Sequence, residues 1–125
     1  MVPFSILNTL MLNMKINSPY LLLLLFFSFY ATSAEKFTID LAINNGVFTP
    51  QVLNVPTKKI IRIKVSNIGD QPAEFESTQL RKEKVLAPGA KSVVVIAPLR
   101  EGSYVFFDDF HLDLPKGKII AREHE

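Results

Sequence analysis

Turn-forming residues divide most of this chain into short apolar runs, and this pattern restricts its fold more than any other feature. The clearest run covers residues 37–43, where Phe, Ile, Leu and Ile alternate with smaller or polar side chains. Such alternation is typical of a strand that buries one face. Asn44-Asn45-Gly46 follows directly, and Asn and Gly favour the backbone conformations of tight turns. We therefore expect short strands that are joined by turns.

Four later runs are also rich in Ile, Val and aromatic residues, and they cover 60–65, 93–96, 104–107 and 119–121. A shorter strand is expected around Phe75. Residues 47–55 form another run, but Pro50 restricts it to a sheet edge or a bulge, since proline cannot donate to a strand ladder. Only residues 78–84 indicate a short helical turn. We predict an all-β domain, a Greek-key β-sandwich of about seven or eight short strands.

The first part of the chain, residues 1–34, has the pattern of a secretory signal peptide. Its apolar core, Tyr20–Tyr30, consists almost wholly of Leu and Phe, with Lys15 before it and small residues up to Ala34 after it. A charged region, an apolar region and a cleavage site thus occur in the expected order. Because the apolar core has about 11 residues and a membrane-spanning helix needs about 20, we expect cleavage after Ala34.

The position of the first translated residue affects this interpretation. A start at Met14 would give a signal peptide of conventional layout, whereas a start at Met1 would lengthen the apolar segment and favour its retention as a membrane anchor. With cleavage, residues 35–125 form the exported domain. We expect this domain to be periplasmic in a bacterium with two membranes.

The composition of residues 35–125 excludes some function classes. This part has 13 Lys and Arg, which is the 14 of the whole chain less Lys15, and 12 Asp and Glu. Nucleic-acid binding, which needs a clustered basic surface, is not indicated. The chain has no cysteine, so its own core, a metal or a partner must hold the domain together instead of disulfides.

Residues 102–121 are chemically the most informative stretch. A predicted strand at 104–107 ends in an acidic loop that carries three candidate metal ligands, namely Asp108, Asp109 and His111. The first and the last of these are three residues apart on one loop, so they can face a common ion. Carboxylates combined with one imidazole suit harder or borderline ions such as iron or copper(II).

A second group of acidic residues precedes this loop and comprises Glu74, Glu76 and Glu83. The first two are two positions apart on a predicted strand, so both point to one face while Phe75 points to the core. If these carboxylates converge with those of the loop, repulsion should raise some of their pKa values unless a cation compensates. That repulsion is a physical reason to expect a bound cation.

Each candidate ligand also has an ordinary explanation. A Glu-x-Glu pair on a strand is usually solvated, and charge alternation at 81–84 is common on protein surfaces. Asp108 and Asp109 could cap turns through their side-chain oxygens. His111 could be a hydrogen-bonded structural residue, and His124 lies near the end of the chain, where side chains are commonly solvated.

The acidic loop and the strand before it resemble the ligand loop of the cupredoxins. In that loop, a strand of the form Tyr-x-Phe-x leads to Cys-x-x-His, and a methionine precedes a glycine. The positions that match are Tyr104, Phe106, His111 and Gly117. Asp108 stands at the place of the cysteine, and Pro115 lies near that of the methionine. The resemblance therefore implies the cupredoxin scaffold without a type 1 blue-copper centre.

Four further motifs match this family in the same order, and they are Phe48-Thr49-Pro50, Leu53-Asn54-Val55-Pro56, Val65-Ser66-Asn67 and Ala87-Pro88-Gly89. Glu74 lies near the position of the first histidine ligand of blue-copper proteins. Within the family, the acidic residues resemble those of the cupredoxin-like domains associated with bacterial high-affinity iron permeases, including the EfeO type. This resemblance implies an iron or copper ion as ligand and a membrane iron permease as partner.

Three functions follow from these observations. The first is an exported protein that captures or relays iron or copper through Glu74, Glu76, Glu83, Asp108, Asp109 and His111. The second is a metal-free β-sandwich that binds a protein partner through its loops or a strand edge. An enzyme is the weakest possibility, because the sequence has no nucleophile–base order and no phosphate-binding glycine loop. We expect no catalytic residues.

Overall fold

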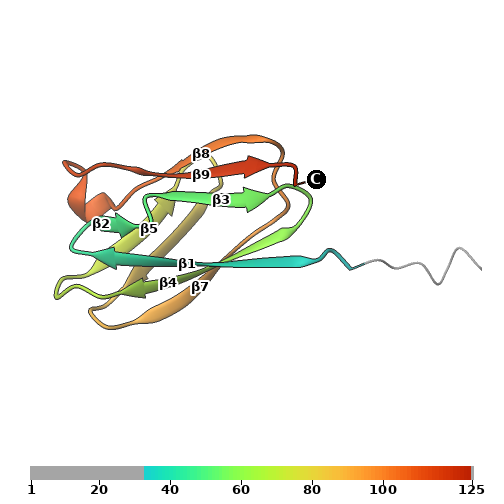
Figure 1. Cartoon of the computed structure of the whole chain (residues 1–125). Helices are drawn as coiled ribbons and strands as arrows, with labels where there is room; N and C mark the ends of the chain where they lie inside the picture. Colours follow the sequence, from blue (N-terminus) through green and yellow to red (C-terminus); the bar gives the residue numbers. More distant parts are fainter. Residues whose placement is uncertain (1–32, 125) are drawn as a thin grey trace, which may run out of the picture. The chain divides into compact units, whose positions relative to one another are not determined.

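The computed structural model of this 125-residue chain describes residues 33–124. The predicted signal peptide, apart from Ser33 and Ala34, lies outside the described residues. Within 33–124, no helix has the length and apolar character that a membrane span requires. The described part contains nine strands and one short 3-10 helix, and Figure 1 shows how the strands are arranged.

The elements in chain order are β1 (Lys36–Asn44), β2 (Val47–Thr49), β3 (Val52–Pro56), β4 (Ile60–Asn67), β5 (Ala73–Ser77), β6 (Lys82–Leu86), β7 (Lys91–Ile96), β8 (Gly102–Phe106), η1 (Asp109–His111) and β9 (Gly117–Arg122). The predicted all-β class is confirmed. There are more strands than expected, because the run around Pro50 is divided into β2 and β3, and because β6 is a strand.

The prediction of a short helical turn at residues 78–84 is wrong. Residues 78–81 form a turn, and Arg81 has a φ of +53° there. The chain then returns as β6, which pairs antiparallel with β5. A segment of seven residues is too short for helical periodicity to be a firm signal, and the pairing with β5 decides its conformation.

The strands form two layers of a sandwich. One layer is a four-stranded sheet in the order β2-β1-β4-β7. The other contains the sheet β3-β9-β8 and the hairpin β5-β6, which are linked by a backbone bridge between Glu76 and Phe107. Neighbouring strands β1 and β4 are parallel, as are β3 and β9. Such pairs need crossover connections, and the chain passes repeatedly from one layer to the other.

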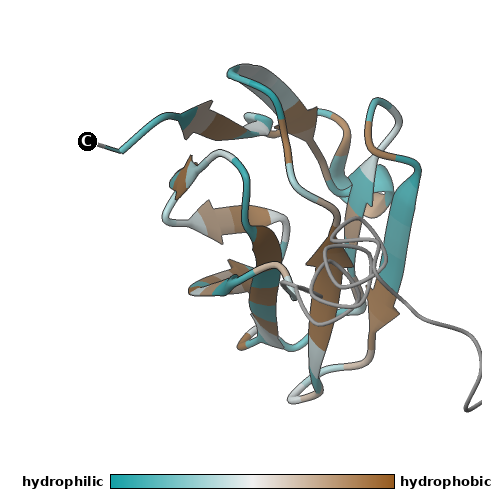
Figure 2. Ribbon diagram, turned by 90° about the vertical axis from the view of Figure 1, so that its right-hand side faces the viewer, coloured by the Kyte–Doolittle hydropathy of each residue, from teal (hydrophilic) through white to brown (hydrophobic). Residues whose placement is uncertain are grey.

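The hydrophobic core lies between the layers and follows from the alternation in the sequence. Figure 2 shows apolar and polar residues alternating along the strands. Three aromatic rings occupy one end of the core: Phe106 stacks on Phe75 with ring centroids 5.0 Å apart and meets Phe48 edge to face at 4.8 Å. A side chain at Gly117 would overlap the Phe106 ring, so close packing explains why glycine occupies that position.

The described termini lie together at one end of the sandwich (Figure 1). There the backbone N–H of Ile60 donates a hydrogen bond to the carbonyl oxygen of Glu35, and that of Thr57 donates to the carbonyl oxygen of Arg122. The opposite end is formed by four connections, which are the β1–β2 turn, the β4–β5 loop, the β6–β7 turn and the β8–β9 loop with η1. We call this end the tip. All six acidic or imidazole residues predicted as ligands lie at the tip or on the β5–β6 hairpin next to it.

Candidate metal site

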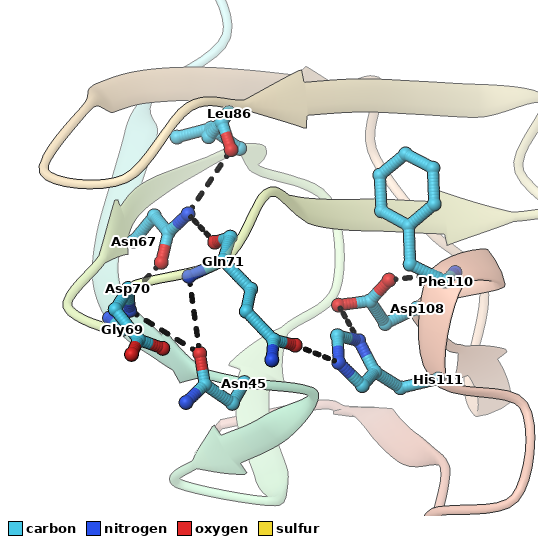
Figure 3. A network of polar contacts seen from close by, with 9 residues as sticks. All are labelled: Asn45, Asn67, Gly69, Asp70, Gln71, Leu86, Asp108, Phe110 and His111. Atoms are coloured by element: carbon cyan, nitrogen blue, oxygen red, sulfur yellow. Dashed lines mark hydrogen bonds and ion pairs between the residues drawn. The ribbon is translucent and has the colours of Figure 1, made fainter.

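The β4–β5 loop at the tip is held by two asparagine side chains (Figure 3). The buried Asn67 amide donates hydrogen bonds to the carbonyl oxygens of Gln71 at 2.8 Å and Leu86 at 3.0 Å, and its Oδ1 accepts from the Gly69 N–H at 3.0 Å. Oδ1 of Asn45 accepts from two further backbone N–H groups of the same loop. The loop therefore has a defined conformation that positions the Gln71 side chain.

Asp108 and His111 form a pair within the β8–β9 loop. The buried Asp108 accepts a hydrogen bond from the Phe110 N–H at 2.9 Å, which caps η1. Its second oxygen lies 3.3 Å from Nδ1 of His111, and Nε2 of His111 lies 2.9 Å from Oε1 of Gln71 (Figure 3). Both ring nitrogens of His111 thus have protein partners. A side chain at Gly46 would overlap His111, so the imidazole lies directly against the β1–β2 turn.

Three other carboxylates converge beside this pair. Glu74, Glu76 and Asp109 each place one carboxylate oxygen within 4.8 Å of the others. The first two share the outer face of β5, as predicted, and Phe75 between them is fully buried in the core. Asp109 is the first residue of η1, which contacts β5. As a result, Glu74 is only 4% exposed although it lies on the outer face of its sheet.

The electrostatics of this carboxylate cluster favour a proton or a cation. Burial raises the pKa of Glu74 to about 7, and a hydrogen bond with the Glu83 carboxyl and the charges of Glu76, Glu83 and Asp109 add to this effect. The pKa of Glu76 is also raised, by burial first and then by the charges of Asp109 and Glu83. Carboxylates that approach one another in this way favour whatever compensates their charge.

The structure thus divides the six predicted ligands into two groups. Glu74, Glu76 and Asp109 converge, and Glu83 lies beside Glu74. The other two, Asp108 and His111, bind each other, as shown in Figure 3, and do not belong to the converging set found within residues 33–124. Asp108 caps η1, as its alternative interpretation as a turn-capping residue predicted.

Sequence reasoning missed two polar residues that shape the tip. Asn67 precedes Ile68-Gly69, a pattern from which its side-chain bond to the Gly69 N–H could have been predicted. Gln71 gives no such local signal, because its partner His111 is 40 residues further along the chain. Gln71 and His111 line a hollow of about 270 Å³ together with Pro72 and Phe110.

Apolar side chains are also unusually exposed at the tip. Among the described residues, the four most exposed large apolar side chains are Ile68 at 62%, Leu112 at 60%, and Val47 and Phe110 at 54% each. All four belong to the connections of the tip or begin the strand that follows one of them. Exposed apolar residues that gather at one place commonly mark an interaction surface.

Comparison with known proteins places this chain among related folds. Residues 19–121 match the sequence profile of the cupredoxin-like domain. An uncharacterized protein of Rickettsia prowazekii is 35% identical over 92 residues, which is 74% of each chain. Among solved structures, the metal-binding domain of the Cu(I)-exporting P-type ATPase CopA of Streptococcus pneumoniae D39 superimposes with a TM-score of 0.63 and 13% identity, covering 74% of this chain and 92% of that domain.

A second solved structure, a copper-binding protein in its apo form, has a TM-score of 0.62 and 19% identity, and it covers 73% of this chain and 92% of its own. At these identities, both structures establish the arrangement of the strands. The donor atoms that could hold an ion are those of this chain's own residues.

Proposed function

Since this chain belongs to the cupredoxin-like domain family, we propose that it is an exported protein that binds a metal ion through carboxylate oxygens at the tip. The observation that carries this proposal is the convergence of Glu74, Glu76 and Asp109 around a Glu74 side chain that is almost fully buried. None of the ion pairs within residues 33–124 includes these carboxylates or that of Glu83. A bound cation would compensate their repulsion.

The available donor atoms favour a hard or borderline ion. Residues 15–125 contain neither Cys nor Met, so the domain has no sulfur ligand of the kind that copper(I) prefers. We propose iron or copper(II) as the ion, with Glu74, Glu76 and Asp109 as ligands and Glu83 as their hydrogen-bond partner. Manganese takes the same oxygen ligands and is a necessary comparison.

We propose capture or relay of the ion as the role of this site, outside the cytoplasm and beside a membrane iron permease. The similarity of the acidic motifs to those of permease-associated domains supports this partner. The pneumococcal domain belongs to an ATPase that exports a metal ion, which supports a transport context for the scaffold. The proposal includes no catalytic turnover.

Thermal unfolding of the metal-free protein tests this proposal. Added Fe(II), kept anaerobic, or Cu(II) should raise the melting temperature, because a ligand that binds only the folded state stabilises it by mass action. At a free ion concentration 100 times Kd, we expect a rise of about 10 °C or more. The double variant Glu74→Gln with Asp109→Asn should lose this response.

The matched control is Asp40→Asn, which removes an exposed carboxylate from β1, away from the tip. This variant should respond to the ions like the unaltered protein. A melting curve that neither iron, copper(II) nor manganese moves would refute the metal site. An equal response in the double variant would place the ion elsewhere.

A metal-free interaction module is the second candidate, and the exposed apolar side chains of the tip favour it. In this case the tip would bind a protein partner through Ile68, Phe110 and Leu112. Replacing Glu74 and His111 together by Ala should then leave partner binding and cellular metal uptake unchanged, whereas Phe110→Ser with Leu112→Ser should abolish binding. Loss of metal uptake in the first double variant would count against this candidate.

A further inference from the structure

β7 is the longest edge strand of the domain, and little in its sequence protects its free edge. It forms one end of the four-stranded sheet, and its sequence, Lys-Ser-Val-Val-Val-Ile, contains no proline and a single charged residue, Lys91, at its start. Proteins normally protect edge strands by shortness, proline or charge. At the other end of this sheet, β2 has three residues and Pro50 follows it. In the second layer, β3 ends at Pro56 and β6 carries three charged residues.

The register shows which groups β7 presents at its free edge. Asn67 donates to the carbonyl of Ala90, which fixes the phase of the antiparallel β4–β7 ladder, so that Ser92, Val94 and Ile96 exchange hydrogen bonds with β4. The backbone groups of the alternate residues, Lys91, Val93 and Val95, therefore point away from β4. Among the backbone hydrogen bonds outside the strand ladders within residues 33–124, none involves these three residues.

The side chains of these alternate residues add an apolar strip to the edge. Val93 and Val95 lie on the outer face of the sheet and are 39% and 48% exposed. On the inner face, Val94 and Ile96 are buried in the core. β-branched residues in a row stabilise paired strands, so β7 offers both the backbone groups and the side chains that a further strand needs.

We propose that β7 pairs antiparallel with β7 of a second copy of this chain, about a two-fold axis at Val93. This register uses the free backbone groups of both strands and places Val93 opposite itself and Lys91 opposite Val95 of the second copy. The two Lys91 ammonium groups are then separated by four residue steps along the strands, about 13 Å, which exceeds the Debye length of about 8 Å at physiological salt. The strand is thus complementary to itself.

The symmetry of this pairing is the reason to choose a second copy over a foreign strand. An isologous interface needs one surface that fits itself. β7 has this property, because Lys91, its single charged residue, lies far from Lys91 of the second copy. The two four-stranded sheets would join into one sheet of eight strands. Since β7 starts at the tip and the strands run in opposite directions, the two tips would lie at opposite ends of the dimer and both carboxylate clusters would stay accessible.

The oligomeric state tests the proposal, with protein purified from cells that express the full chain. Sedimentation velocity should show a dimer whose population rises with concentration, since a single strand pair buries little area. Val93→Lys places two charges on the axis and should give a monomer at every concentration. The matched control Val52→Lys changes a valine of β3 that is 40% exposed, and it should dimerise normally.

Disulfide trapping tests the register separately, because the chain has no cysteine of its own. Directly opposed residues of a hydrogen-bonded antiparallel pair have Cα atoms about 5.5 Å apart, a separation that a disulfide can bridge. Diamide should therefore link Val93→Cys into a covalent dimer and link Val95→Cys much less, because Val95 faces Lys91. Unaltered protein that is monomeric throughout, a dimeric Val93→Lys variant, or equal cross-linking of the two cysteine variants would overturn the proposal.

Discussion

At the scale of single residues, burial gives Glu74 a chemistry that a surface glutamate lacks. The side chain is buried on a strand that contacts η1, while Glu76, Glu83 and Asp109 bring further negative charge towards it. The pKa of Glu74 consequently rises to about 7. Near neutral pH, a proton and a metal ion would therefore compete for the same carboxylate.

The raised pKa of Glu74 predicts that the metal-free protein becomes less stable as the pH rises. Between about pH 4.5 and 7 the folded state holds a proton that the unfolded state has released, so the free energy of unfolding falls with increasing pH. We expect a loss on the order of 2–3 kcal/mol across this range. Urea unfolding at several pH values measures it.

Glu74→Gln supplies the control for this prediction, because its side chain stays neutral at every pH. The decrease in stability between pH 4.5 and 7 should be clearly smaller in this variant, where Glu76 still has a raised pKa. If both proteins lose the same stability, burial and the neighbouring carboxylates do not raise the pKa of Glu74.

At the scale of elements, the loops between the strands, more than the strands themselves, determine the geometry of the tip. The β4–β5 loop carries Gln71 to His111, and it is fixed to β6 through the amide of Asn67. A single buried side chain thus joins two strands and a loop. Two members of the carboxylate cluster, Glu74 and Glu76, lie on β5 directly after this loop, so the position of β5 at the tip depends on the same anchor.

Asn67→Ala should therefore destabilise the protein and loosen the loop. The substitution leaves the carbonyl oxygens of Gln71 and Leu86 without these donors, and a buried group that loses its partner costs about 1–3 kcal/mol. Urea unfolding should show this loss, and hydrogen exchange should quicken in residues 68–72. Asn54→Ala, on the exposed side of β3, should change stability by less than about 0.5 kcal/mol. Equal losses in both variants would contradict the anchoring role.

At the scale of the whole molecule, the domain keeps its candidate metal site apart from its described chain ends. The described termini lie at one end and the tip at the other (Figure 1). The free edge of β7 belongs to the layer opposite the β5–β6 hairpin. The proposed metal site and the proposed dimer interface therefore use different surfaces, and a substitution in one should leave the other intact.

The composition of the whole domain predicts discrimination against copper(I). Because residues 15–125 have no sulfur ligand, copper(I) should stay with a competing chelator while the oxygen site still binds iron or copper(II). Competition with a chromogenic copper(I) chelator measures this difference. Copper(I) retention that depends on Glu74 would show that the carboxylate cluster accepts soft ions and would contradict the assignment.

Much of the fold could be predicted because its causes are local. Alternation at residues 37–43 follows from a strand with one buried face, and Asn45 and Gly46 form the expected turn. The β6 strand could not be predicted, because its charged residues resemble a helix surface and only pairing with β5 holds them extended. Local preference and tertiary pairing disagree there, and pairing decides the conformation.

The sequence by itself determined most of the strands, the core and the acidic character of the tip, because period-two alternation and turn residues act over a few positions. Only the tertiary structure decided which carboxylates meet. Asp108 and Asp109 are neighbours, yet the first caps η1 and contacts His111 while the second joins Glu74. The direction of each side chain depends on how η1 packs against β5, a contact between segments that are distant in the chain and that no local pattern encodes.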